Sequence, residues 1–271
     1  MQELLSAWPI FIALMVTGVC AGILSGLLGV GGGIVIVPVL YFLLPQFGVS
    51  ATSAMAIAVA TSLATIVPTA ISSTLAHHRK GNVDVALLKR WGVFIALFAV
   101  LGSLLGNHLD ASWLSAMFGV IAMLVALNML FRAGAPALFP SLPGRAGQSV
   151  LASMVGGLSV MIGIGGGTIG VPVLNAFNVP AHRAVGTAAA FGLIIALPGA
   201  ATLLAVGSAP VDAPFGNLGL INVPAFLAIV PLTVLFAPLG AKIAASLNQK
   251  TLKQAFAVVL FCTGIRMLIS L

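Results

Sequence analysis

The sequence predicts an all-α membrane protein that crosses the bilayer many times and consists of two inverted repeats. Three observations predict this fold class. Of the 271 residues, 61% are hydrophobic and 6% are charged. Apolar runs follow one another along the whole chain, and a glycine-rich block occurs once in each half. So few charges could not cover a water-soluble domain, whereas long apolar runs suit helices in a bilayer.

The glycine-rich block has the same spacing in both halves. Gly29-Val-Gly-Gly-Gly33 recurs 134 positions later as Gly163-Ile-Gly-Gly-Gly167. At the same offset Pro38 matches Pro172, and Ser25 matches Ser159. Glycine breaks at corresponding positions of two repeats are typical of the discontinuous helices that form transporter binding sites. The block therefore marks both an internal duplication and a candidate site.

The first repeat, residues 1–132, is expected to contain five membrane segments. We expect a Gly-broken hairpin, a turn and three helices, over residues 8–30, 34–44, 45–48, 50–76, 91–107 and 113–131. The segment 34–44 has about eleven residues, too few to span roughly 30 Å of hydrocarbon. It is therefore predicted to return toward the side from which the preceding segment came.

The second repeat, residues 149–271, follows the same plan after a linker at residues 133–148 that is rich in Pro and Gly. Its expected segments cover residues 149–164, 168–177, 179–206, 223–246 and 251–270. Residues 207–222 are expected to form a loop.

The basic residues decide between parallel and inverted repeats. If each half crosses four times, six basic residues face one side and four the other. If each half contributes five segments, all ten fall on one side, which the positive-inside rule requires of the cytoplasmic side. The sequence thus predicts inverted repeats in the cell membrane, a cytoplasmic linker and both termini outside. The ten residues are Arg79, Lys80, Lys89, Arg90, Arg132, Arg145, Arg183, Lys242, Lys250 and Lys253.

Arg266 is the one remaining base and lies inside the last predicted helix. It could reach the outer interface with its long side chain, or it could face a substrate. Its counterpart in the first repeat, when the last helices of the repeats are aligned, is Asn128.

The two glycine breaks are predicted to hold an anion. A helix that begins at Gly33 or Gly167 presents unpaired N–H groups and the positive end of its dipole, and glycine lets a ligand approach the backbone. Packing of small residues is the competing explanation for the individual serines and threonines. The predicted substrate-binding residues are Ser25, Gly31, Gly32, Gly33, Ile34, Ser159, Gly165, Gly166, Gly167, Thr168 and Thr187.

The absent groups narrow the function further. None of the four carboxylates or four histidines falls within a predicted membrane interior, where proton relays and cation sites need them. This disfavours a cation channel, a metal transporter and an intramembrane enzyme. We expect no metal, no cofactor and no nucleic acid, and we expect Cys20 and Cys262 to be packed thiols.

At this point the residues resemble a known family. The duplicated Gly-x-Gly-Gly-Gly-(x)4-Pro blocks, together with residues 78–84 and 182–187, are similar to those of the TauE/SafE family of sulfite exporter-like permeases. The resemblance implies a secondary transporter for small sulfur-containing anions such as sulfite, sulfonates or sulfoacetate. An anion channel and a non-transporting scaffold or accessory subunit remain alternatives. The expected partners are the anion and the lipid bilayer, with a homodimer as a further possibility.

Overall fold

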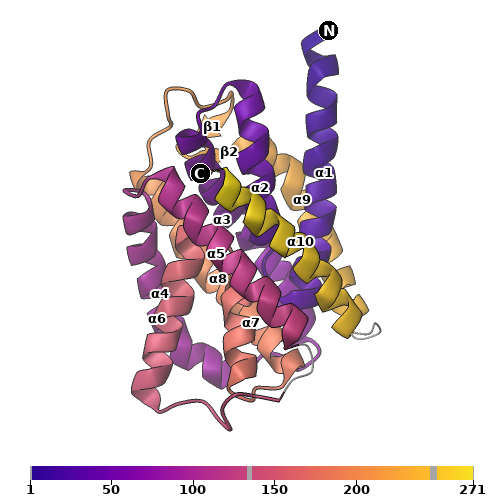
Figure 1. Ribbon diagram of the computed structural model, residues 1–271, viewed down its shortest axis with the longest axis vertical. Coiled ribbons are helices and arrows are strands. Elements are labelled where there is room, and N and C mark those ends of the chain that lie inside the picture. Colours follow the sequence, from indigo (N-terminus) through magenta and orange to yellow (C-terminus); the bar gives the residue numbers. More distant parts are fainter. Residues whose placement is uncertain (1, 133–135, 245–248, 271) are drawn as a thin grey trace.

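The computed structural model describes residues 2–132, 136–244 and 249–270, which fold into one helical bundle (Figure 1). The chain up to residue 132 forms five α-helices and a short 3-10 helix. These are α1 (Gln2–Leu28), α2 (Gly33–Leu43), η1 (Leu44–Phe47), α3 (Ala51–His78), α4 (Val85–Gly106) and α5 (Ala111–Phe131). The later part contains α6 (Arg145–Met161), α7 (Gly166–Ala176), α8 (Ala181–Val206), α9 (Val223–Ile243) and α10 (Gln249–Ile269).

The structure confirms a helical protein that spans the membrane several times. Within the described residues, six helices are long and apolar enough to cross a bilayer, namely α1, α3, α4, α5, α8 and α9. Helices α2 and α7 have 11 residues each and are too short, as the sequence predicts. Each follows a break after a longer helix, so the expected hairpins of one long and one short helix are present.

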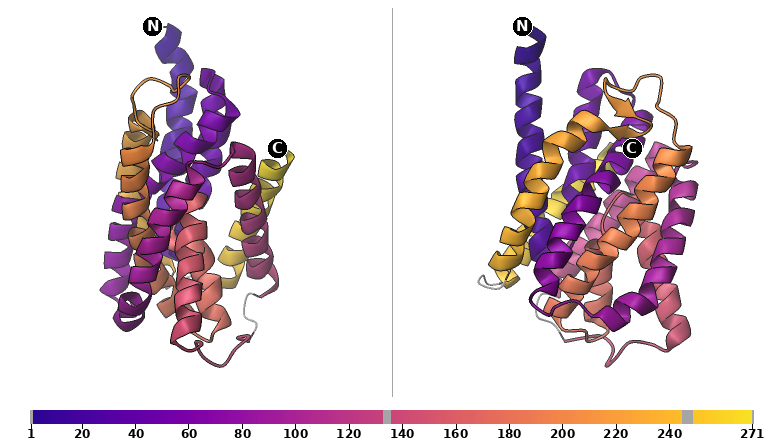
Figure 2. Two further views of the ribbon diagram at one scale, coloured as in Figure 1. Left: turned by 90° about the vertical axis from the view of Figure 1, so that its left-hand side faces the viewer. Right: turned by 180° about the vertical axis from the view of Figure 1, so that it is seen from behind.

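The hairpins point in opposite directions along the bundle. Helix α1 starts at the upper end in Figure 1, and α2 runs back toward that end. Helix α6 starts at the lower end, next to the connection that follows α5, and α7 returns toward it (Figure 2). The start of α1 and the end of α10 lie toward the same end of the molecule.

The helix pairings correspond when the two halves are exchanged. Helix α1 packs along α9, and its counterpart α6 packs along α4. In the same way α3 contacts α9 where α8 contacts α4, while α3 packs on α8 and α5 on α10. Glycines allow the closest approaches: a Cβ atom on Gly22 would lie 2.8 Å from the Thr233 carbonyl oxygen, and one on Gly156 2.5 Å from that of Ile95. Small residues therefore set these interhelical distances.

Several elements differ from the sequence prediction, among them α1, which begins at Gln2 instead of residue 8. Helix α4 begins at Val85 instead of 91, because the Asp84 carboxylate accepts a 3.0 Å hydrogen bond from the Leu87 N–H and caps the helix. Helix α6 begins at Arg145, inside the predicted linker. The expected loop at 207–222 contains a two-stranded antiparallel hairpin, β1 (Asn217–Leu218) and β2 (Ile221–Asn222).

Asp212 ties the loop before this hairpin to the start of α3. Its carboxylate accepts hydrogen bonds from the Ser53 hydroxyl at 2.6 Å and from the Ser50 backbone N–H at 2.7 Å. These donors, the Ser53 hydroxyl first, lower the pKa of Asp212 to about 2. The carboxylate also lies at the positive end of the α3 dipole, where negative charge is favourable.

This tether predicts an acid-dependent loss of stability. A depressed pKa stabilises the fold at pH values above the unfolded-state pKa of 3.8, and this contribution is lost as pH falls through about 2. We expect Asp212→Asn to lower the unfolding temperature near pH 6 and to flatten its dependence on pH below 4. Thermal unfolding in detergent measures both.

Asp110→Asn is the matched control, because Asp110 occupies the N-cap of α5 without a side-chain hydrogen bond to the helix. Identical unfolding temperatures for Asp212→Asn and the unmodified protein at pH 6 would contradict the role of the tether.

Candidate functional site

The two glycine-rich turns touch each other through their backbones. A Cβ atom on Gly165 would lie 2.5 Å from the carbonyl oxygen of Val30, and one on Gly33 would overlap the carbonyl oxygen of Gly163. Real side chains do not tolerate such contacts with backbone atoms, so glycine is the residue that fits. The turns therefore meet, and each needs glycine because the other turn occupies the space beside it.

The two turns reach this contact with different backbone conformations. In the first turn Gly29, Gly31 and Gly32 have φ angles of 69°, 73° and 81°, in the left-handed region that favours glycine. The second turn has one such residue, Gly163, at 68°, which is the counterpart of Gly29. Gly166 instead faces α8, where an added Cβ would lie 2.5 Å from the Cβ of Phe191. The two glycine blocks thus have the same spacing in the sequence but different backbone conformations in the structure.

Polar side chains from α3 bind the backbone where α1 and α6 stop. Ser73 and His77 donate hydrogen bonds of 3.1 and 2.8 Å to the carbonyl oxygens of residues 25 and 26, in the last turn of α1. Since a carbonyl oxygen only accepts, the His77 Nε2 carries the proton in this contact. Ser62 donates to the Gly163 carbonyl oxygen at 2.7 Å. Ser62 and His77 thus satisfy carbonyl oxygens that a broken helix leaves without backbone partners. Ser73 adds a second donor to the residue 25 carbonyl oxygen, which also accepts a 2.9 Å hydrogen bond from the Gly29 N–H.

Three of the predicted site residues have buried hydroxyl groups with no hydrogen-bond partner among the described residues. They are Ser25, Ser159 and Thr168, which are exposed by 1%, 0% and 1%. Buried hydroxyl groups in proteins usually bind a carbonyl or another polar group. Of the three, Thr168 lines the cavity described below, so its hydroxyl group is available to a ligand there.

Thr187 has a structural partner instead. Its Oγ1 accepts a 2.9 Å hydrogen bond from the N–H of Asp84, the residue that caps α4. The opposite half repeats the arrangement, with Thr61 Oγ1 accepting from the N–H of Asn222, the cap of α9, at 2.9 Å. Asp84 also forms a 3.3 Å ion pair with Arg183. Thr187 thus anchors the start of α4.

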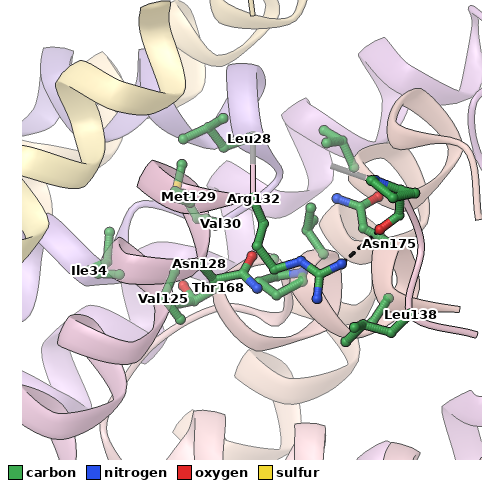
Figure 3. A pocket seen from close by; sticks show the side chains of 16 residues that line it. Leu28, Val30, Ile34, Val125, Asn128, Met129, Arg132, Leu138, Thr168 and Asn175 are labelled. Atoms are coloured by element: carbon green, nitrogen blue, oxygen red, sulfur yellow. Dashed lines mark hydrogen bonds between the residues drawn. The ribbon is translucent and has the colours of Figure 1, made fainter. Parts of the chain in front are cut away.

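A cavity of about 90 Å³ lies beside the turns, between α7 and α5 (Figure 3). Three predicted site residues line it: Ile34, Gly167 and Thr168. The other eight do not line it, and their role in binding stays a prediction. Residues that complete the lining include Leu28, Val30, Val125, Met129, Leu138, Val171, Pro172, Ala176 and Val185.

The cavity also contains polar residues that the sequence prediction did not assign to the site. Asn128 and Arg132 come from α5 and the residue after it, and Asn175 comes from α7 (Figure 3). The Arg132 guanidinium donates a 2.7 Å hydrogen bond to the Pro136 carbonyl oxygen. Each asparagine interrupts an otherwise apolar segment, which is the signal that could have identified both.

The cavity offers hydrogen-bond donors and a positive charge. No described group accepts a hydrogen bond from the backbone N–H of Gly167 or Thr168 at the start of α7. No carboxylate or histidine is among the lining residues. Likewise, no group of three His, Cys, Asp or Glu side chains able to hold a metal occurs in the described residues. A cavity with hydrogen-bond donors and no negatively charged side chain suits a small anion.

Comparisons with known proteins place the chain among membrane transporters. The chain matches the family described as "Sulfite exporter TauE/SafE" over residues 14–267. A probable membrane transporter protein from Haemophilus influenzae is 32% identical over 93% of this chain and 96% of its own length. Probable membrane transporter proteins from Methanocaldococcus jannaschii and Bacillus subtilis are 26% and 28% identical over 94% and 95% of this chain, and over 94% and 97% of their own lengths. No solved structure matches.

The contact between the turns predicts that Gly167→Ala destabilises the protein. The added Cβ would overlap the carbonyl oxygen of Gly29. Because this oxygen belongs to the backbone, the overlap is relieved only if one of the two glycine turns moves away from the other. We expect a loss of at least about 1–3 kcal/mol, the usual cost of overpacking. Gly144→Ala is the control, since its Cβ would meet nothing within 4 Å. Thermal unfolding in detergent compares the two; equal unfolding temperatures would refute the contact.

Proposed function

Because this chain belongs to the sulfite exporter TauE/SafE family and is a multi-span membrane transporter, we propose that it carries small sulfur-containing anions such as sulfite, sulfonates or sulfoacetate. It works as a secondary permease. The observation that carries the proposal is the cavity between α5 and α7. There the Thr168 hydroxyl, two free N–H groups, Asn128 and Arg132 converge in the absence of any carboxylate.

Sulfite and sulfonate groups match these donors chemically. Their oxygen atoms accept several hydrogen bonds and carry negative charge, which the N-terminus of α7 and the Arg132 guanidinium stabilise. The apolar remainder of the lining, including Leu28 and Val125, would contact the carbon skeleton of a sulfonate. The same groups would repel a cation.

Transport proceeds by alternating access of two inverted halves, one with helices α1–α5 and the other with α6–α10, joined by a cytoplasmic linker that ends where α6 begins at Arg145. The exchangeable helix pairings and the opposite directions of the two hairpins support this arrangement. The direct contact between the glycine turns supports a carrier over an open anion channel. In an alternating-access carrier such a contact would separate the spaces on the two sides of the turns.

The distribution of charge supports an orientation in the cell membrane. The loops after α3 and α7, the connection after α5 and the end of α9 lie at the end away from the start of α1 (Figure 2). These segments and the adjoining helix turns carry the basic residues other than Arg266. The connections α4–α5 and α8–α9, which contain Asp110 and Asp212, lie toward the other end. The basic end is therefore cytoplasmic and both termini are outside. The side chains of Lys250 and Lys253 lie outside the described residues.

Transport assays test this function. In proteoliposomes loaded with protein, we expect uptake of labelled sulfite or sulfoacetate that saturates and shows counterflow. Asn128→Leu and Thr168→Val should each lower kcat/KM by roughly tenfold to a hundredfold, because each removes one hydrogen bond to a charged ligand, worth about 1.5–3 kcal/mol.

Ser149→Ala is the control, since this exposed hydroxyl on α6 bonds only to the Arg145 carbonyl oxygen. Fluxes equal to those of empty liposomes would favour a scaffold or accessory subunit. Non-saturable flux without counterflow would favour a channel.

A further inference from the structure

A second pocket lies between the short helix α2 and the last helix α10. Its volume is about 630 Å³, and its lining is mostly apolar, with Val35, Pro38 and Val39 on the α2 side and Val258 and Val259 on the α10 side. The polar lining residues are Gln46, Cys262, Thr263 and Arg266. None of the residues of this pocket except Ile34 was among the predicted site residues.

The second pocket occupies the place of the first one when the two halves are exchanged. Helix α2 contacts α10 in one half of the repeat, as its counterpart α7 contacts α5 in the other. Pro38 lines the second pocket and Pro172, 134 positions later, lines the first. Arg266 is aligned with Asn128, and these two polar residues line the second and first pockets respectively. The two pockets are therefore equivalent positions of the repeat.

The two pockets adjoin at Ile34. This residue, in the first turn of α2, lines both of them and is 3% exposed. The Ile34 position corresponds to Thr168, which faces the first cavity. Ile34 is an apolar side chain between two pockets on opposite sides of the glycine turns. An anion that moved from one pocket to the other would have to pass it, so Ile34 would act as a barrier.

Arg266 carries the charge of the second pocket. Its guanidinium lies 4.5 Å from the centre of the Phe42 ring, a cation–π contact that holds it against α2. Among the described residues the one carboxylate that pairs with a base is Asp84, whose partner is Arg183. The Arg266 charge thus has no described counter-ion, and its donors remain free for an anionic ligand.

We propose that the pocket between α2 and α10 is an outer anion-binding vestibule and that Arg266, held by Phe42, binds the sulfite or sulfonate group there. The inference rests on the proposed function because it concerns the same substrate on the other side of the glycine turns. Arg266 supplies in this vestibule the anion-binding donors that Asn128 and the start of α7 supply in the inner cavity.

Cys262 makes the proposal testable without a transport assay. It lies four residues before Arg266, on the same face of α10, and its thiol is exposed in the pocket. Because the chain has two cysteines, Cys20→Ser leaves Cys262 as the single thiol. The expectation from sequence that both thiols are packed is wrong, since both are exposed.

The experiment compares two methanethiosulfonate reagents of opposite charge on the Cys20→Ser protein in detergent. One carries a sulfonatoethyl group and the other a trimethylammonium ethyl group. In each case the thiolate forms a mixed disulfide and methanesulfinate leaves. We expect the ratio of the anionic to the cationic rate to fall about tenfold in Arg266→Gln, the effect of one charge several ångströms away at an intermediate dielectric constant. Arg266→Lys should retain most of the ratio.

Competition identifies the bound group. Sulfoacetate, which does not react with these reagents, should slow the modification of Cys262 when Arg266 is present and should not slow it in Arg266→Gln. An unchanged rate ratio in Arg266→Gln, or no reaction with either reagent, would overturn the vestibule. If the ratio depends on Arg266 while proteoliposomes show no flux, the anion site stands and the proposed transport fails.

Discussion

The backbone contact between the two glycine turns is the constraint on which the rest of the structure depends. Gly165 lies against Val30, and Gly33 against Gly163, so closely that a side chain on either glycine would displace the opposite turn. Two long helices must stop inside the apolar bundle to make this contact. Their termini then bring unpaired polar backbone into a region where water is scarce, which is costly unless other groups bind it.

The unpaired backbone groups are treated differently at the carboxyl ends of the long helices and at the amino end of the short helix α7. The carbonyl groups where α1 and α6 stop receive donors from Ser62, Ser73 and His77 of α3. The N–H groups that begin α7 receive no described acceptor and lie next to a cavity with Arg132 and Asn128. Donors from α3 bind the carbonyl oxygens at these helix ends, whereas the first N–H groups of α7 have no described acceptor. Free N–H groups at the positive end of a helix dipole favour negative charge, and the proposed anion site rests on this asymmetry.

Part of the candidate site could be predicted from the sequence and part could not. The repeated spacing identified the glycines and pointed to Thr168, because a break at matched positions is visible without coordinates. Asn175 was missed and Asn128 was named only as the counterpart of Arg266, since residues 47 positions apart meet only when α5 packs against α7. Thr187 does not line the cavity and its hydroxyl oxygen accepts a hydrogen bond from the Asp84 N–H, so its contact with the anion stays a prediction. A hydroxyl group does not reveal its partner from sequence.

The sequence by itself determined the helical membrane fold, the two hairpins with short second helices and the family, because hydropathy, glycine spacing and the family blocks are local properties of the chain. The tertiary structure alone decided that the turns touch, that the cavity lies beside the contact, and that Arg266 stacks on Phe42 in a second pocket. These features depend on distances between segments far apart in sequence, which helix packing sets and no local pattern records.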